Sequence, residues 1–137
     1  MSLLPQSTRA TREQDMFEHW DVECEGIRYD VKTQKRLNRS DTEVSNVIWI
    51  ELQNVRGDIG WLKGKADKIA ILLGAYFIIV DREKLFSYIK ETITNLEVQS
   101  FKEYKRWYQR RGRKDIITYL YLSDIEHLIE QYVPLAQ

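Results

Sequence analysis

The spacing of apolar and polar residues predicts most of the strands in this chain. In the segment VIWIELQN, residues 47–54, one face carries Ile48, Ile50 and Leu52, and the other is apolar until Glu51 and Gln53. A strand of this kind is expected to be largely buried. Two alternating runs around Glu25-Gly26 predict a hairpin over 20–33. Two apolar runs, KIAILLG and AYFIIVD, predict a further pair of strands around Gly74-Ala75.

Apolar residues at helical spacing predict three helices. The first is expected over about 7–19, with Thr11 and Gln14 as its capping box. The second is expected over about 82–97, with Asp81 as its cap. A strand, IITYLYL, leads to the third, which starts at the capping box SDIE, residues 123–126. This order predicts an α/β or α+β fold with a mixed central sheet flanked by helices.

Composition narrows the class of protein. The 137 residues, 43% of them apolar, predict one globular domain over 1–137. A single cysteine, Cys24, excludes an internal disulfide and favours an intracellular, cytoplasmic location. The longest apolar stretch is broken by Gly74 and is too short for a membrane span, so we expect no membrane partner. The 21 basic and 21 acidic residues cancel, so only local charge can indicate a polyanionic partner.

Two carboxylates on predicted strands suggest a metal site. Asp30 lies in the middle of the second hairpin strand, and Glu51 lies in the middle of strand 47–54. If these strands pair, the two acids can lie close together on one sheet face. Their repulsion would be relieved by a hard divalent cation, Mg²⁺ or Mn²⁺. The alternative is that both acids pair with basic neighbours such as Lys32, Arg28 or Lys63 on a solvated face.

The segments GIRYDVK and IWIELQN resemble the core of the PD-(D/E)XK nuclease superfamily, over roughly residues 7–81. In this resemblance Asp30 matches the motif Asp and Glu51 the motif Glu. Glu13 is the matching helix acid, with Glu18 as the alternative. The resemblance implies a restriction-endonuclease-like core, here with a C-terminal strand-helix extension. It also implies a Mg²⁺- or Mn²⁺-dependent endonuclease that hydrolyses DNA and leaves a 5′-phosphate, with the backbone carbonyl of Leu52 as a further metal ligand.

The chain departs from this pattern at the motif Lys, where it has Gln53. Glutamine can hydrogen-bond the attacking water but carries no charge. We expect Lys65 to supply that charge, with Lys32 and Lys63 as alternatives. If no lysine does so, the chain is a catalytically inactive nuclease-like module that binds DNA or protein. Asp67 is a further ligand or, as we favour, a helix cap.

Basic residues interleaved with aromatic ones suggest where nucleic acid would bind. The segment FKEYKRWYQRRGRK, residues 101–114, is strongly basic, and its rings could stack on bases. An amphipathic helix with a solvated basic face is the alternative, and Trp61 could either stack on a base or pack in the core. The predicted contacts to nucleic acid are Lys32, Trp61, Lys63, Lys105, Arg106, Arg110, Arg111 and Arg113. A homodimer is expected if two sites cut two strands; a structural domain that dimerises through its C-terminal third is a third possibility.

Overall fold

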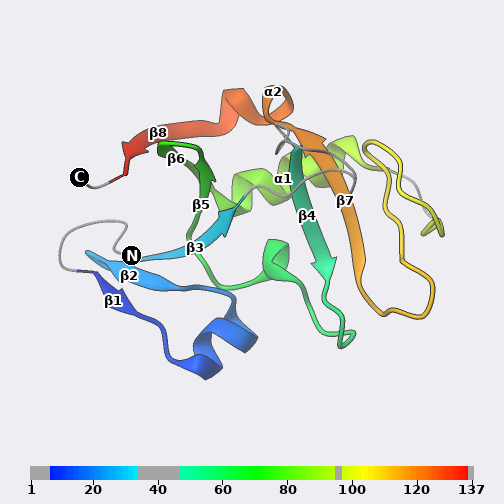
Figure 1. The fold of residues 1–137 in the computed structure, drawn as a ribbon, viewed down its shortest axis with the longest axis horizontal. Coiled ribbons are helices and arrows are strands. Elements are labelled where there is room, and N and C mark those ends of the chain that lie inside the picture. The colour runs from blue at the N-terminus through cyan, green and yellow to red at the C-terminus, as the bar shows by residue number, and fades with distance from the viewer. Residues whose placement is uncertain (1–6, 34–46, 95–96, 136–137) are drawn as a thin grey trace.

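A computed structural model describes residues 7–33, 47–94 and 97–135 of the chain, which form a mixed α/β fold. Six strands form the main sheet: β1 (Thr8–Arg9), β2 (Val22–Cys24), β3 (Ile27–Thr33), β5 (Lys68–Leu73), β6 (Tyr76–Asp81) and β8 (Ile129–Pro134). The second sheet pairs β4 (Val47–Gln53) with β7 (Ile116–Tyr121). The helical elements are η1 (Gln14–Glu18), η2 (Trp61–Lys63), α1 (Arg82–Thr92), α2 (Leu122–Ile125) and η3 (Glu126–Leu128) (Figure 1).

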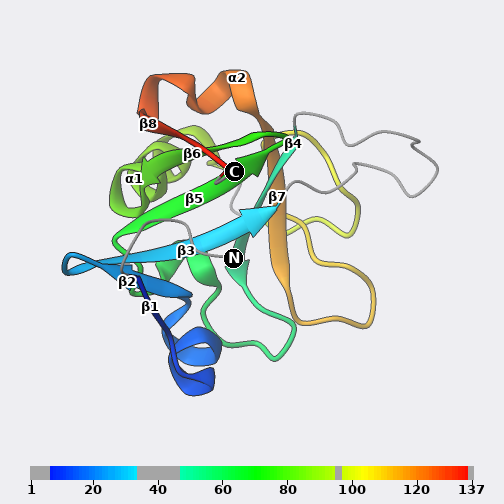
Figure 2. The same ribbon diagram turned by 60° about the vertical axis from the view of Figure 1, so that its left-hand side comes forward.

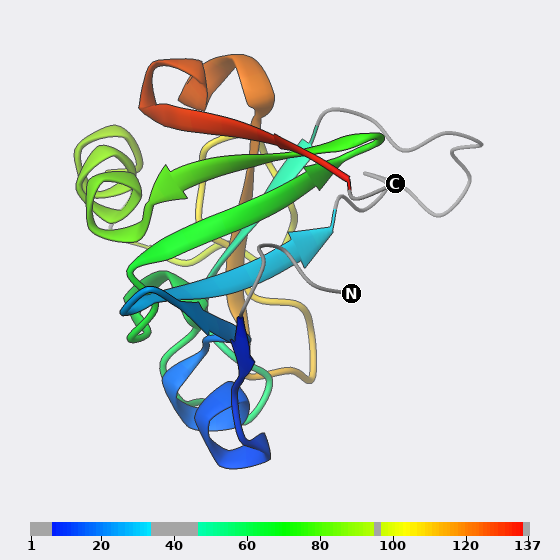
Figure 3. The same ribbon diagram turned by 90° about the vertical axis from the view of Figure 1, so that its left-hand side faces the viewer.

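The main sheet is mixed, as the sequence predicts. Its strand order is β1-β2-β3-β5-β6-β8, in which β3 and β5 are parallel and the other neighbours are antiparallel. The two-stranded sheet lies to one side of it, with β4 and β7 running across the direction of β5 and β6 (Figures 2 and 3). The restriction-endonuclease-like arrangement of these strands stays a prediction.

The larger core fills the space between the two sheets. Ile69 and Ile71 of β5 face it from the main sheet, and Ile48 and Ile50 of β4 face it from the second sheet. Leu85 and Ile89 of α1 pack into the same cluster. Burying each of these side chains contributes about 1.5–3 kcal/mol, so the core holds both sheets and α1 together.

The opposite face of the main sheet carries a smaller apolar cluster. This cluster is formed by the side chains that alternate along each strand with those of the larger core. They include Tyr29 of β3, Ala70 of β5, and Phe77 and Ile79 of β6. The main sheet is therefore apolar on both faces over its central strands, and a charged side chain in this part of β3 must be buried.

Several local predictions are confirmed. The hairpin turns at Glu25-Gly26, and β5 and β6 are joined at Gly74-Ala75. The capping box forms, because the Thr11 backbone donates to Gln14 Oε1 at 2.9 Å and the Gln14 backbone donates to Thr11 Oγ1 at 3.1 Å. The carboxylate of Asp81 accepts from the backbone of Lys84 at the start of α1.

The predicted helices are too long. The first covers little more than η1, because Thr8–Arg9 forms β1 instead. The second ends at Thr92, short of residue 97. The third is interrupted after Leu128, because residues 129–134 form β8 along the edge of β6. There a sheet edge was available for pairing, and tertiary pairing overrides helical spacing. In the described ranges no helix is both long and apolar enough to cross a membrane.

The predicted pairing of the Asp30 and Glu51 strands is wrong. β3 lies between β2 and β5, whereas β4 pairs only with β7 among the described strands. The apolar face of β4 packs against the main sheet instead of extending it. Alternation predicts which face of a strand is buried, but it does not predict the strand's partner.

Candidate acidic site beside the Gly60–Trp61 segment

Asp30 lies in the middle of β3 with only 2% of its surface exposed. It is level with Ile69 of β5, on the side of the main sheet that faces the larger core. One carboxylate oxygen, Oδ1, lies 3.4 Å from Lys32 Nζ. The other, Oδ2, is buried and has no hydrogen-bond partner within the described part of the chain. The predicted pairing with Lys32 is present, but its Asp30 end is buried, whereas the Lys32 side chain is partly exposed.

Burial is the main cause that raises the pKa of Asp30, to about 8. Lys32 acts in the opposite direction, and the charge of the nearby Asp21 raises the pKa further. Because the pKa of the buried Asp30 carboxyl is raised, its ionisation destabilises the folded protein. Such groups occur often at functional sites.

Asp21 and Asp15 are acids that the sequence analysis missed. Asp21 directly precedes β2, and its backbone N–H donates to the carbonyl of Tyr29 at 2.7 Å, which brings it close enough to Asp30 to affect the pKa of that carboxyl. Its Oδ2 accepts from the backbone of Val31 at 2.6 Å. Burial, then a hydrogen bond and charge repulsion from Asp21, raise the pKa of Asp15. Counting back from the predicted turn at Glu25-Gly26 would have placed Asp21 beside Asp30.

Lys32 links Asp30 to the segment after β4. Its ammonium nitrogen lies 5.4 Å from the centre of the Trp61 ring, a cation–π contact. Trp61 itself is 5% exposed and belongs to the larger core. The prediction that Trp61 stacks on a base is therefore wrong, and the alternative that it packs in the core is confirmed. Lys32 is engaged by Asp30 and Trp61, which leaves it little freedom to contact phosphate.

Glu51 is half-buried near the end of β4 and lies against Gly60. A Cβ atom built on Gly60 would come within 2.7 Å of the carbonyl carbon of Glu51 and 2.8 Å of its Cγ. Only glycine allows this approach. In the described residues no salt bridge involves Glu51. The Leu52 carbonyl, the predicted extra ligand, accepts from the Gly60 backbone at 2.8 Å.

The prediction that Asp30 and Glu51 share one sheet face is wrong. One short segment, Gly60–Trp61, nevertheless contacts both Glu51 and the lysine that pairs with Asp30. Trp61 lies under Lys32, the partner of Asp30, and the preceding residue, Gly60, lies against Glu51. Figure 1 shows η2, which starts at Trp61, between the β2–β3 hairpin and the carboxyl end of β4. The two acids therefore flank the Gly60–Trp61 segment from separate sheets.

Arg82, at the start of α1, holds this segment in place. Its Nε donates to the carbonyl of Ala66 at 2.6 Å, and its Nη1 donates to the carbonyl of Leu62 at 3.0 Å. These charge-assisted bonds satisfy one carbonyl of η2 and one carbonyl of the loop that follows it. The position of Gly60 and Trp61 is thus tied to the main sheet and α1.

Gln53, the residue at the motif Lys position, is already engaged. Its amide nitrogen donates to the backbone carbonyl of Lys114 at 2.7 Å, next to an irregularity in the β4–β7 pairing between Glu51 and Gln53. Its side-chain nitrogen is thus fixed, which leaves the side-chain oxygen as its acceptor.

Other residues predicted at the site lie outside this arrangement. Glu13 is exposed, and Glu18 accepts from Trp20 Nε1 and pairs with Arg28 at 3.5 Å. The side chains of Lys63 and Lys65 are exposed. Asp67 does not cap a helix; its Oδ2 accepts from the backbone of Arg28 at 2.9 Å and ties the loop to β3.

Most of the predicted nucleic-acid contacts in the basic segment have acidic partners. Lys105 pairs with Asp124 at 3.3 Å, Arg106 pairs with Glu103 at 3.4 Å, and Arg110 pairs with the buried Asp115. Arg111 and Arg113 are exposed, and neither has a salt bridge to another described residue. The alternative that residues 101–114 form an amphipathic helix is wrong, because they form turns and isolated bridges.

Asp30 and Glu51 offer oxygen ligands for the expected Mg²⁺ or Mn²⁺. In the part of the chain that the structure describes, no three His, Cys, Asp or Glu side chains are arranged to hold an ion. Mg²⁺ needs fewer protein ligands, since it keeps several waters and binds through one or two carboxylates. The unpartnered oxygen of Asp30 and the Glu51 carboxylate, which lacks a salt bridge to any described residue, are donors of the right kind.

Comparisons with protein-family models, with curated proteins and with solved structures gave no match to this chain.

Proposed function

We propose that this chain is a metal-dependent nuclease that hydrolyses DNA phosphodiester bonds, with Asp30 and Glu51 acting beside the Gly60–Trp61 segment. The buried, unpartnered carboxylate oxygen of Asp30 is the observation that supports this most. Lys32 lies 3.4 Å from the other oxygen, so a buried carboxylate that ionises here is only partly compensated, and a bound cation would offset the remaining cost. The Asp and Glu-x-Gln spacing of the chain, which resembles the nuclease motif, is the second support.

Each residue then has a role that its contacts allow. Asp30 and Glu51 would hold Mg²⁺ or Mn²⁺, which would promote ionisation of the attacking water and stabilise charge on the phosphate. Lys32 positions the Asp30 carboxylate through the 3.4 Å ion pair and is itself held over Trp61. Gln53, with its nitrogen bonded to Lys114, can accept a hydrogen bond from the water through its oxygen.

A nucleic-acid-binding module without catalysis is the second candidate. Gln53 favours it, because the motif Lys is absent and the Gln53 amide nitrogen is occupied by a backbone carbonyl. The exposed Lys63 and Lys65 form no salt bridge with Asp30 or with another described residue, so no ion pair holds either lysine at the site. This candidate predicts binding that weakens with salt and no metal-dependent turnover.

A cleavage assay distinguishes the two candidates. Supercoiled plasmid and labelled single-stranded and branched oligonucleotides are incubated with Mg²⁺, Mn²⁺ or EDTA. Cutting is expected with either metal and not with EDTA, and we expect Glu51→Gln to slow it by about a hundredfold or more, because a ligand to the cation is lost.

The matched control is Glu91→Gln, which changes an exposed glutamate on α1 outside the candidate site and is expected to cut like the wild type. Equal rates for Glu51→Gln and wild type would reject the assigned site. Binding without any metal-dependent cutting would establish the second candidate.

A further inference from the structure

The loop after β4 and the loop before β7 are joined by a hydrogen bond and a packing contact. The backbone carbonyl of Lys114 accepts from Gln53 Nε2 at 2.7 Å and from Gln109 Nε2 at 3.1 Å. Gly57 lies against the Lys114 side chain, since a Cβ built on Gly57 would be 3.4 Å from Lys114 Cδ. The loop after β4 and the loop before β7 therefore form one surface with a fixed shape, which lowers the entropy cost of binding a ligand there.

This surface has an excess of positive charge. Arg111, Arg113 and Lys114 are exposed, and among the described residues no carboxylate forms a salt bridge with any of them. Arg56, in the first loop, has one salt bridge to a described residue, a 3.7 Å contact with the exposed Asp58. In a chain with no net charge, such a local group of cations attracts a polyanion.

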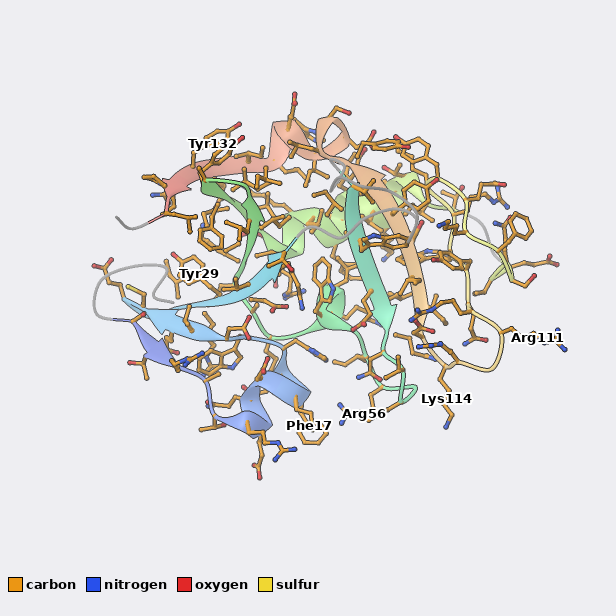
Figure 4. The ribbon with its side chains drawn as sticks, viewed as in Figure 1. Phe17, Tyr29, Arg56, Arg111, Lys114 and Tyr132 are labelled. Carbon is orange, nitrogen blue, oxygen red and sulfur yellow. The ribbon has the colours of Figure 1, made fainter. Side chains whose placement is uncertain are left out.

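An exposed aromatic ring continues the surface. Phe17 of η1 is 57% exposed, and the guanidinium carbon of Arg56 lies 5.3 Å from its ring centre. Figure 4 shows Phe17 and Arg56 side by side, with Lys114 and Arg111 beyond them along the same edge of the molecule. A ring backed by an arginine is a stacking platform for a base.

We infer that this surface, the basic rim formed by Phe17, Arg56, Arg111, Arg113 and Lys114, binds single-stranded nucleic acid. The cations would contact successive phosphates, and Phe17 would stack on one base. A duplex would use the cations but not the ring, because its base faces are covered by neighbouring base pairs. DNA and RNA share this chemistry, so the rim itself does not separate them.

Gln53 links the rim to the candidate acidic site. Gln53 contributes to both, because it follows Glu51 by two residues in β4 and bonds the Lys114 carbonyl of the rim. The inference extends the proposed nuclease function by naming its substrate as an unpaired strand. It does not depend on catalysis, because binding can be measured in EDTA.

The test is fluorescence anisotropy in EDTA with labelled oligothymidylate and oligouridylate of about 20 nucleotides, and with a duplex of equal length. Both single strands are expected to bind at least about tenfold more tightly than the duplex. Tighter binding of oligothymidylate would identify DNA as the ligand, and tighter binding of oligouridylate would identify RNA.

Two variants probe the two halves of the rim. The double variant Arg111→Glu with Arg113→Glu is expected to weaken binding more than about tenfold. The slope of the logarithm of the binding constant against the logarithm of the salt concentration is expected to become shallower by about 1.4, which is about 0.7 for each lost phosphate contact. Phe17→Ala is expected to weaken binding by about 5- to 150-fold with no change in salt slope, because stacking is lost.

Each variant has a matched control. Tyr132→Ala removes a ring of similar exposure, 60%, on β8 at the opposite edge of the molecule (Figure 4), and Lys84→Glu with Lys90→Glu reverses two exposed charges on α1. Both controls are expected to bind like wild type.

The inference is overturned if wild type binds no single strand in EDTA, if the rim variants bind like their controls, or if duplex binds more tightly than both single strands. Binding without cutting would reject the nuclease proposal alone, and cutting without rim-dependent binding would reject this inference alone.

Discussion

Asp30→Asn is expected to reduce cleavage by about a thousandfold or more and, at alkaline pH, to make the folded protein more stable. Activity falls because a cation held by Asp30 would supply several kcal/mol to the transition state. Stability rises because the substitution removes a buried charge and keeps an oxygen that can accept from Lys32, 3.4 Å away from Oδ1 in the wild type. A residue needed only for the fold would change both properties in the same direction.

The pKa of Asp30 determines the pH range of this effect. Its folded-state pKa of about 8 lies above the ordinary value of 3.8, so between these values the folded protein binds more protons than the unfolded chain. The contribution of Asp30 to the free energy of unfolding is therefore complete below about pH 4. This contribution is lost as the pH rises towards 8, because the folded protein must then bury a charge. Because Asp30 is nearly fully buried, the loss is on the order of a few kcal/mol.

Urea denaturation at about pH 5 and about pH 9 measures this difference. We expect wild type to lose more stability than Asp30→Asn between the two conditions. The matched control is Asp115→Asn, which changes an equally buried aspartate, 1% exposed, that pairs with Arg110. This control is expected to lose stability at both pH values. An Asp30→Asn protein that is less stable than wild type at about pH 9, or that cuts at the wild-type rate, would contradict the role assigned to Asp30.

Gly60→Ala is expected to lower the free energy of unfolding by about 3 kcal/mol and to reduce cutting. The added Cβ would lie 2.7 Å from the backbone carbonyl carbon of Glu51, and backbone atoms in a paired strand cannot move away cheaply. Relief of the clash must shift either Glu51 or the Gly60–Trp61 segment, and both belong to the candidate site.

The control for this substitution is Gly74→Ala, in the turn between β5 and β6. A Cβ there meets nothing within 4 Å, so only the positive φ of 67° opposes the change, at about 1–2 kcal/mol. Thermal denaturation and the cleavage assay are measured on both variants. If Gly60→Ala is no less stable than Gly74→Ala and cuts like wild type, the close packing of Gly60 on Glu51 has no part in the site.

Local features of this fold follow directly from the sequence. Alternation and turn residues locate the β2–β3 hairpin and the β5–β6 pair, and side-chain chemistry locates the caps at Thr11 and Asp81. These features depend on residues close together in the chain. Asp21 belongs with them, since counting back along the hairpin from its turn is enough to bring it near Asp30.

Long-range features do not follow from the sequence in the same way. Alternation indicates that Ile48 and Ile50 face a core, but it does not indicate that β4 pairs with β7 and not with β3. Residues 129–134 have helical spacing, yet the open edge of β6 draws them into a strand. The position of Glu51 against Gly60 depends on both the β4–β7 pairing and the loop that returns along β4.

The central claim is that Asp30 and Glu51, carried by separate sheets, hold one cation. It is tested most directly by Mn²⁺ binding, followed by electron paramagnetic resonance, in wild type, Asp30→Asn, Glu51→Gln and the double variant. The account predicts that each single variant loses at least about tenfold in affinity and that the double variant loses less than the sum of the two free-energy changes, because both remove the same site. Wild-type affinity in Glu51→Gln, or losses that add fully, would show that the two carboxylates do not share an ion.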